Sequence, residues 1–188
     1  MSEHEEYTPG AADAGAVLED NGDHSMLILV REFRHAPEKV WQALTDPAQL
    51  REWAPFDADR SLAAVGPVSL STIGAPKSQV SETRVTRAEV PKLLEYRWGD
   101  NDMRWQLEPL GDGTRLTLWH NIGPNFISMG AAGWHICLDV CDRFLGGDPL
   151  RRIVGAEAMK FDWPRLNTEY AKQFGVESPA WAIQQGAK

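Results

Sequence analysis

Cysteine is scarce in this chain of 188 residues, which has only two, Cys137 and Cys141. They lie four positions apart within a helical pattern, so their side chains share one face of a helix and point alongside each other. That arrangement is a poor geometry for a disulfide. We therefore expect both thiols to be reduced, in keeping with a reducing compartment.

Long apolar runs and excess positive charge are also missing. No run approaches the roughly 20 apolar residues that span a bilayer, and Ser2 to Glu6 lack the basic-then-apolar order of a signal peptide. The 19 Lys and Arg residues against 27 Asp and Glu give a formal charge of -8, which repels phosphate backbones and anionic lipids. We expect a cytoplasmic protein with no membrane span and no nucleic-acid partner.

Two prolines each begin a short amphipathic helix directly after an apolar, strand-like run from Met26 to Phe33. Pro37 and Pro47 would occupy the first helical position, where proline loses no hydrogen bond, and Asp46 can cap the second helix. The apolar residues of the two helices form one stripe, made of Val40, Trp41, Leu44, Leu50 and Trp53. Both helices are therefore expected to lie against a sheet.

Strand patterns dominate from about Ala58 to His120, where glycine and proline breaks separate short segments. Apolar and polar residues alternate in these segments, which predicts antiparallel strands with one apolar and one wet face. The alternation is clearest in three apolar sets, Leu94, Tyr96, Trp98, then Met103, Trp105, Leu107, then Leu116, Leu118, His120. Trp119 lies on the polar face, and the pattern does not explain it.

The apolar period becomes helical from Ser128 to Leu145, with one stripe made of Trp134, Cys137, Leu138, Cys141 and Leu145. A further helix is expected from about Trp163 to Phe174, ending at Gly175. The segment between the two helices, Leu150 to Phe161, is ambiguous.

One domain accommodates all of these elements, because they lie within residues 26–176. Residues 1–25 are rich in Glu, Asp, Gly and Ala and have few apolar anchors, so we expect a flexible acidic tail there. Residues 177–188 are expected to form a C-terminal tail.

Four segments in their order along the chain carry a family resemblance: Ala36 to Trp41, Asp46 to Trp53, Asp112 to Leu118 before His120, and Gly133 to Asp139. Together they resemble the SRPBCC (START-like) superfamily and, within it, the homologues of the activator of the 90-kDa heat-shock-protein ATPase. The similarity covers about residues 26–175. It implies the α+β helix-grip fold, in which a curved antiparallel sheet wraps around a long C-terminal helix and two short helices follow the first strand.

A cavity between the sheet and the long helix is a further implication of that fold. Trp98, Trp105 and Trp134 lie on apolar stripes that would face each other across it, so they either line a pocket or fill a core. Indole rings offer flat surfaces that suit aromatic or polyketide-like ligands. The expected ligand-binding residues are Trp98, Trp105, His120, Trp134, Cys137 and Cys141.

Histidines supply the candidate chemistry. His120 continues an apolar strand face and is the candidate catalytic residue, with a satisfied core histidine as the alternative. His135 and Asp139 are four apart and could form an acid-base pair, but we expect a solvent-side helical pair. We expect no metal site, because His135 and Cys137 face different ways on a helix.

The superfamily contains lipid and hormone carriers, polyketide cyclases and aromatases, and co-chaperones, and a fold alone does not decide among them. We expect this protein to bind a small apolar or aromatic molecule without a cofactor. One alternative is a cyclase-like or aromatase-like enzyme in which His120 or His135 moves protons. Another is a co-chaperone-like module with a chaperone as its partner.

Overall fold

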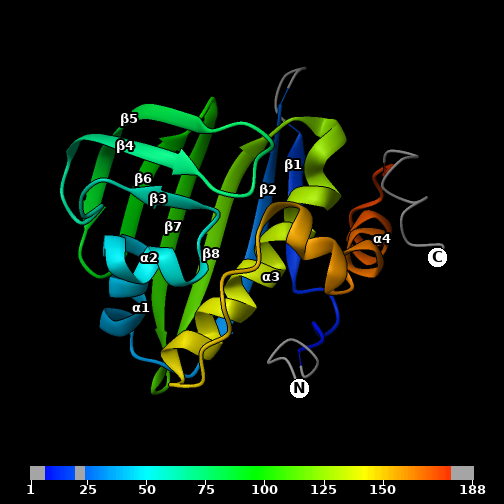
Figure 1. The fold of residues 1–188 in the computed structure, drawn as a ribbon. Coiled ribbons are helices and arrows are strands. Elements are labelled where there is room, and N and C mark those ends of the chain that lie inside the picture. Colours follow the sequence, from blue (N-terminus) through cyan, green and yellow to red (C-terminus); the bar gives the residue numbers. More distant parts are fainter. Residues whose placement is uncertain (1–6, 20–23, 179–188) are drawn as a thin grey trace.

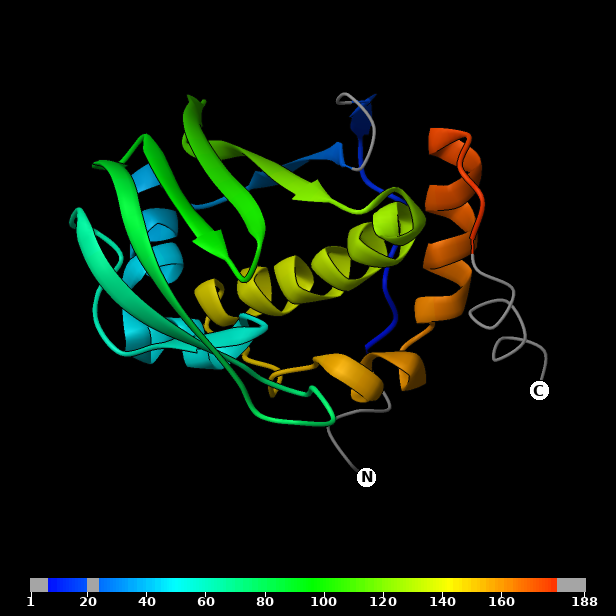
Figure 2. The same cartoon turned by 90° about the horizontal axis from the view of Figure 1, so that it is seen from above.

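A computed structural model describes residues 7–19 and 24–178 of the chain. Within them, one antiparallel sheet has eight strands in the order β1-β2-β8-β7-β6-β5-β4-β3, and it curves around helix α3 (Figures 1 and 2). The strands are β1 (Gly15–Glu19), β2 (Ser25–Phe33), β3 (Phe56–Ala58), β4 (Gly66–Thr72), β5 (Gln79–Glu89), β6 (Leu93–Trp98), β7 (Asn101–Leu110) and β8 (Gly113–Ile122). The α-helices are α1 (Pro37–Thr45), α2 (Pro47–Trp53), α3 (Ile127–Leu145) and α4 (Trp163–Phe174), and the 3-10 helices are η1 (Pro124–Phe126) and η2 (Gly155–Lys160). The expected α+β helix-grip fold is confirmed.

The two short helices begin at the predicted prolines. Pro37 and Pro47 are the first residues of α1 and α2, and the Asp46 side chain accepts a hydrogen bond from the amide of Ala48 at 3.0 Å. The indole N–H of Trp53 donates to the Ala43 carbonyl at 2.9 Å, which joins the two helices. The predicted stripe is buried against the sheet, as the amphipathic pattern requires.

The predicted alternation matches the burial of β6, β7 and β8 except at Leu93 and Thr117, which are buried on the other face. Trp119, which the pattern did not explain, lies on the convex face opposite Arg104 of the neighbouring strand. The Arg104 guanidinium carbon lies 5.0 Å from the centre of the indole ring, a cation–π contact that covers this partly exposed side chain.

Helix α3 is covered on two sides. The concave sheet packs against one side, and the N-terminal segment, residues 7–13, runs between α3 and α4 on another (Figure 2). The amide of Asp13 donates to the Tyr170 hydroxyl at 2.8 Å, and the amide of Ala12 donates to the Glu169 carboxylate at 3.1 Å. Polar contacts thus attach the N-terminal segment to α4.

The structure therefore differs from the expected flexible tail at 1–25. Residues 7–13 make the contacts just described, and β1 pairs with β2 at the edge of the sheet. Composition could not indicate the order of residues 7–13, because Tyr7, Ala12 and Asp13 form hydrogen bonds with residues more than 100 positions away. The rest of that range lies partly outside the described residues, as does most of the expected C-terminal tail, and an independently folding domain at 26–176 stays a prediction.

The ambiguous segment contains η2 and lies against the turn between β4 and β5. Gly155 has φ of +60°, and a Cβ built on it would lie 2.3 Å from the carbonyl oxygen of Gly74. Only glycine fits this approach of two backbones. Helix α4 then begins at Trp163 and ends before Gly175, which has φ of +63°, as predicted.

Candidate functional site

Four aromatic rings meet between the sheet and α3: Trp98 of β6, Trp105 of β7, His120 of β8 and Trp134 of α3. We call them the aromatic cluster. The Trp134 ring centre lies 5.3 Å from that of Trp105 and 5.9 Å from those of Trp98 and His120. The rings of Trp98 and His120 lie 6.1 Å apart. Three neighbouring strands thus place three of the predicted site residues around a fourth, Trp134 of the helix.

His120 is oriented by Trp134. The indole N–H of Trp134 donates to Nδ1 of His120 at 2.9 Å. Indole nitrogen can only donate, so Nδ1 is the acceptor and a neutral His120 carries its proton on Nε2. Within the described residues, Nε2 is buried and has no hydrogen-bond partner.

Burial also keeps His120 uncharged. The residue is 3% exposed, and desolvation of the charged form lowers the pKa of its imidazole to about 4. At neutral pH the ring is therefore a neutral group with an occupied acceptor at Nδ1 and a proton at Nε2. The nitrogen of a neutral His120 that could accept a proton already holds the hydrogen bond from Trp134.

Trp98 lies at the edge of the cluster and is partly exposed. Its indole N–H donates to the Thr72 hydroxyl at 3.0 Å. The same side chain lines a hollow of about 310 Å³ at the ends of β4, β5 and β6, together with Thr72, Gln79, Val80, Ser81, Gly99 and Asn101. Trp98 therefore lies between this hollow and the buried His120.

The other tryptophans of the cluster lie deeper. Trp105 is 1% exposed, donates its N–H to the Tyr96 hydroxyl at 3.0 Å and packs edge-on against Trp53. Because the Trp134 ring contacts the other three rings, side chains occupy the space in which a cavity was expected. Trp98 is the ring of the cluster with the least cover, since the other three are buried.

Phe56 and Tyr96 belong to the same surroundings, although the sequence analysis did not assign them to the site. The Phe56 ring centre lies 5.2 Å from that of Trp98 and 6.1 Å from that of Tyr96. Tyr96 could have been found from its place on the apolar strand face beside Trp98. Phe56 follows the second helix in a three-residue strand, which is too short to show an alternation.

Cys137 and Cys141 lie one and two turns beyond Trp134 on α3. At 1.5 Å per residue, these steps are about 4.5 and 10 Å along the helix axis. Both are free and buried, and burial raises the pKa of the Cys137 thiol to about 12 and that of Cys141 as well. These neutral thiols act as small apolar side chains in the core.

Two glycines of α3 have opposite surroundings. A Cβ built on Gly130 would lie 2.6 Å from the end of the Ile122 side chain, so the helix packs closely on the sheet there. A Cβ built on Gly133 would meet no atom within 4 Å. Open space therefore borders the helix one residue before Trp134.

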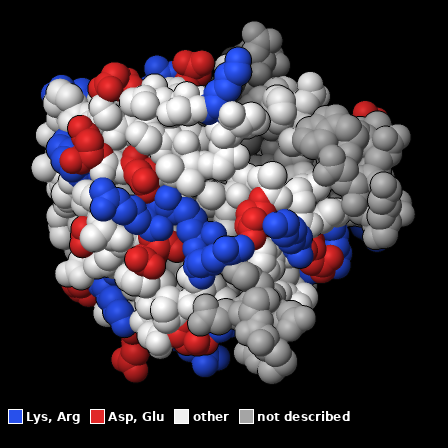
Figure 3. Space-filling view, viewed as in Figure 1, with Lys and Arg blue, Asp and Glu red and all other residues white. Residues whose placement is uncertain are grey.

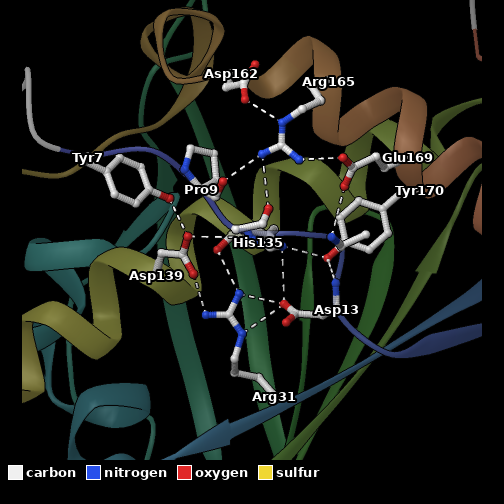
Figure 4. A network of polar contacts seen from close by, with 12 residues as sticks. Tyr7, Pro9, Asp13, Arg31, His135, Asp139, Asp162, Arg165, Glu169 and Tyr170 are labelled. Carbon is white, nitrogen blue, oxygen red and sulfur yellow. Dashed lines mark hydrogen bonds and ion pairs between the residues drawn. The ribbon is translucent and has the colours of Figure 1, made fainter.

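A group of polar residues surrounds His135 of α3 (Figure 4). The imidazole Nδ1 lies 2.8 Å from the Tyr170 hydroxyl and 3.4 Å from the Asp13 carboxylate, and Nε2 lies 3.5 Å from Asp139. His135 is only 2% exposed. His135 does pair with Asp139, but the expected position on the solvent side is wrong, because the N-terminal segment and α4 cover this face of the helix.

Arg31 holds the two carboxylates of this group. Its guanidinium contacts Asp13 and Asp139 at 2.6 Å each, and the Tyr7 hydroxyl donates to Asp139 at 2.5 Å. Burial alone would raise the pKa of Asp139, but the hydrogen bond from His135 and the charge of Arg31 outweigh it and lower that pKa. The arrangement ties β2, α3, α4 and the N-terminal segment together.

Charges on the face that carries the helices are mixed. A band of Lys and Arg crosses this face, with Asp and Glu beside it (Figure 3). Among the ion pairs of the structure, Arg152 contacts Asp57 at 2.6 Å and Arg165 contacts Glu169 at 2.6 Å. Within residues 7–19 and 24–178, no group of His, Cys, Asp or Glu is arranged to hold a metal ion. No helix in the described part of the chain is long and apolar enough to cross a membrane.

Solved structures share this fold at low sequence identity. A conserved protein of unknown function from Enterococcus faecalis is 19% identical, with a TM-score of 0.65 over 85% of this chain and 89% of that one. The solution structure of CalU16 from Micromonospora echinospora is 20% identical, with a TM-score of 0.65 over 97% of this chain and 100% of CalU16. DynU16, a protein of the dynemicin biosynthetic locus, is 20% identical, with a TM-score of 0.57 over 70% of this chain and 50% of DynU16.

A comparison with curated proteins finds no match. The model of one protein family matches residues 34–146, which is more than half of the chain and includes α1 to α3 and the whole aromatic cluster. The resemblance carried by the sequence motifs is thereby confirmed. The chain belongs to the family described as Activator of Hsp90 ATPase homolog 1-like protein.

Proposed function

We propose that this protein binds a small apolar or aromatic molecule at the aromatic cluster, between the sheet and α3. The observation that carries the proposal is the position of Trp98, which contacts the buried His120 and Trp134 on one side and lines a hollow of about 310 Å³ on the other. In this account its indole moves into the hollow, and the ligand lies between Trp98 and Trp134.

This movement breaks a hydrogen bond and the ring contacts that Trp98 makes with Phe56, His120 and Trp134. Trp98 gives up one neutral hydrogen bond to Thr72, and such a bond contributes about 1 kcal/mol. A bound aromatic ring regains apolar contact at about 25 cal/mol per Å² with the two indoles. The proposal therefore requires a bound ring to replace both the hydrogen bond and the aromatic contacts that Trp98 gives up.

The experiment is a calorimetric titration with 2-acetylnaphthalene. We expect one molecule to bind per chain, and Trp98→Ala to weaken binding about tenfold, because the ligand loses one of its two aromatic walls. Trp119→Ala is the matched control, since Trp119 is a partly exposed strand residue on the opposite face of the sheet. Failure of the wild type to bind, or equal weakening by both variants, would contradict the proposal.

The enzymatic alternative receives less support from the site. A cyclase-like reaction that uses His120 as a general base needs a free acceptor nitrogen, and Nδ1 already accepts the N–H of Trp134. His135 does not contact the cluster and lies among Asp13, Asp139 and Tyr170. The proposed function is therefore binding without catalysis and without a cofactor.

The family description favours a chaperone partner as a second candidate. A pull-down with purified Hsp90 tests it directly. Saturable binding that survives Trp98→Ala would assign the interaction to a surface other than the aromatic cluster, and the absence of binding would remove this candidate.

A further inference from the structure

The hydrogen bond between Trp134 and His120 restricts the chemistry of the ligand. Because the indole donates to Nδ1, the proton of neutral His120 is on Nε2, and this N–H is a buried donor without a partner among the described residues. Turning the ring over would place carbon against the indole N–H and lose the bond. The donor therefore keeps its position.

A buried donor that finds no acceptor costs about 1–3 kcal/mol, so a ligand that supplies an acceptor gains more than a hydrocarbon of the same shape. The residues around His120 also favour a ligand without charge. The neighbours of His120 in the cluster are the neutral rings of Trp98 and Trp134, and its cross-strand partners are Leu27 and Met103. An anion would lose its hydration here without gaining a cation in return.

We infer that the ligand of the aromatic cluster is an aromatic molecule with a neutral carbonyl-type oxygen, which accepts the Nε2 proton of His120 while the rings pack against Trp98 and Trp134. This inference rests on the proposed function and names its ligand class. His120 then determines specificity as a hydrogen-bond donor, and it transfers no proton.

Two probes of nearly equal shape test the inference. In 2-acetylnaphthalene the substituent has a carbonyl oxygen, and in 2-isopropenylnaphthalene a CH₂ group replaces that oxygen. We expect the wild type to bind the ketone about tenfold more tightly than the alkene. Equal affinities would overturn the inference while leaving the proposed function intact, whereas binding of neither probe would contradict the proposed function itself.

Two variants separate the nitrogens of His120. In His120→Asn an amide oxygen can take the place of Nδ1 and accept the Trp134 N–H, while the Nε2 donor is lost. We expect this variant to bind the ketone and the alkene with about equal affinity. In His120→Gln the longer amide can place an N–H near the position of Nε2, and we expect part of the preference to return.

A nitrogen NMR spectrum of the wild type provides a readout that is independent of affinity. We expect the proton on Nε2 in the free protein, and a downfield shift of that proton with the ketone but not with the alkene. A proton on Nδ1, or a ketone preference that His120→Asn leaves unchanged, would overturn the inference.

Discussion

The indole N–H of Trp134 donates to Nδ1 of His120 at 2.9 Å, which links the long helix α3 to strand β8 in the middle of the core. The same bond determines which nitrogen of the imidazole carries the proton. A contact within the core thus determines the hydrogen-bonding chemistry of the proposed site.

Stability should fall in acid because of His120. Its pKa is about 4 in the folded protein and 6.5 as the ordinary value, so between these values the unfolded chain binds a proton that the folded chain does not. The contribution of neutral His120 is complete above pH 6.5 and is lost as the pH falls toward 4. At pH 4 the loss is on the order of 3 kcal/mol.

Urea unfolding at pH 7 and pH 4 measures this effect. The wild type should lose about 3 kcal/mol of stability relative to His120→Asn between pH 7 and pH 4, because asparagine does not titrate. His24 is exposed, so His24→Asn serves as the control and should follow the wild type at both values. A constant difference between wild type and His120→Asn would contradict the assignment of a buried neutral imidazole.

Two substitutions in α3 should differ in their effect on stability. Gly133→Ala adds a Cβ that meets no atom within 4 Å, so the gain in helix propensity of about 0.5–1 kcal/mol should appear in full. Gly130→Ala should gain less, because its Cβ lies 2.6 Å from the end of Ile122, which must move. Thermal unfolding compares the two, and a more stable Gly130→Ala would contradict the packing described for α3.

Arg31 should be needed for stability. In Arg31→Met the carboxylates of Asp13 and Asp139 lose their shared cation, and breaking a buried pair in this way costs about 3 kcal/mol. Arg115→Met is the control, because Arg115 lies 3.8 Å from Glu32 on the exposed face, where an ion pair contributes less than about 1 kcal/mol. Equal free energies of unfolding for the two variants would show that the Arg31 group is not structural.

The N-terminal segment should exchange its amides slowly. The amide of Asp13 donates to the Tyr170 hydroxyl, so Tyr170→Phe should speed hydrogen exchange at Asp13, by about tenfold for one hydrogen bond. Exchange at strand β7 serves as the internal control and should not change. Fast exchange at Asp13 in the wild type would contradict the attachment to α4 and support the flexible tail expected from composition.

The sequence predicts local structure well where local rules determine it. Pro37 begins α1, Gly175 follows α4, and the alternation around Trp105 matches the burial of β7. The burial of His135 could not be predicted in this way. The stripe with Trp134 identifies only the sheet side of α3, and the segments that cover the other side come from the two ends of the chain.

The site was predictable in part for the same reason. Alternation places Trp98, Trp105 and His120 on one sheet face, and helical periodicity turns Trp134 toward it. These patterns do not show that Trp105 is buried while Trp98 borders a hollow, because the depth of a side chain depends on how α3 packs on the sheet. The bond between Trp134 and His120 depends on the same packing.

The indole N–H signals of the eight tryptophans offer the most direct measurement of ligand binding at the cluster. In a proton–nitrogen NMR titration with 2-acetylnaphthalene, we expect the signals of Trp98 and Trp134 to shift most and the signal of Trp119 on the convex face to stay in place. Shifts confined to Trp119, or no shifts at any indole, would contradict binding between the sheet and α3.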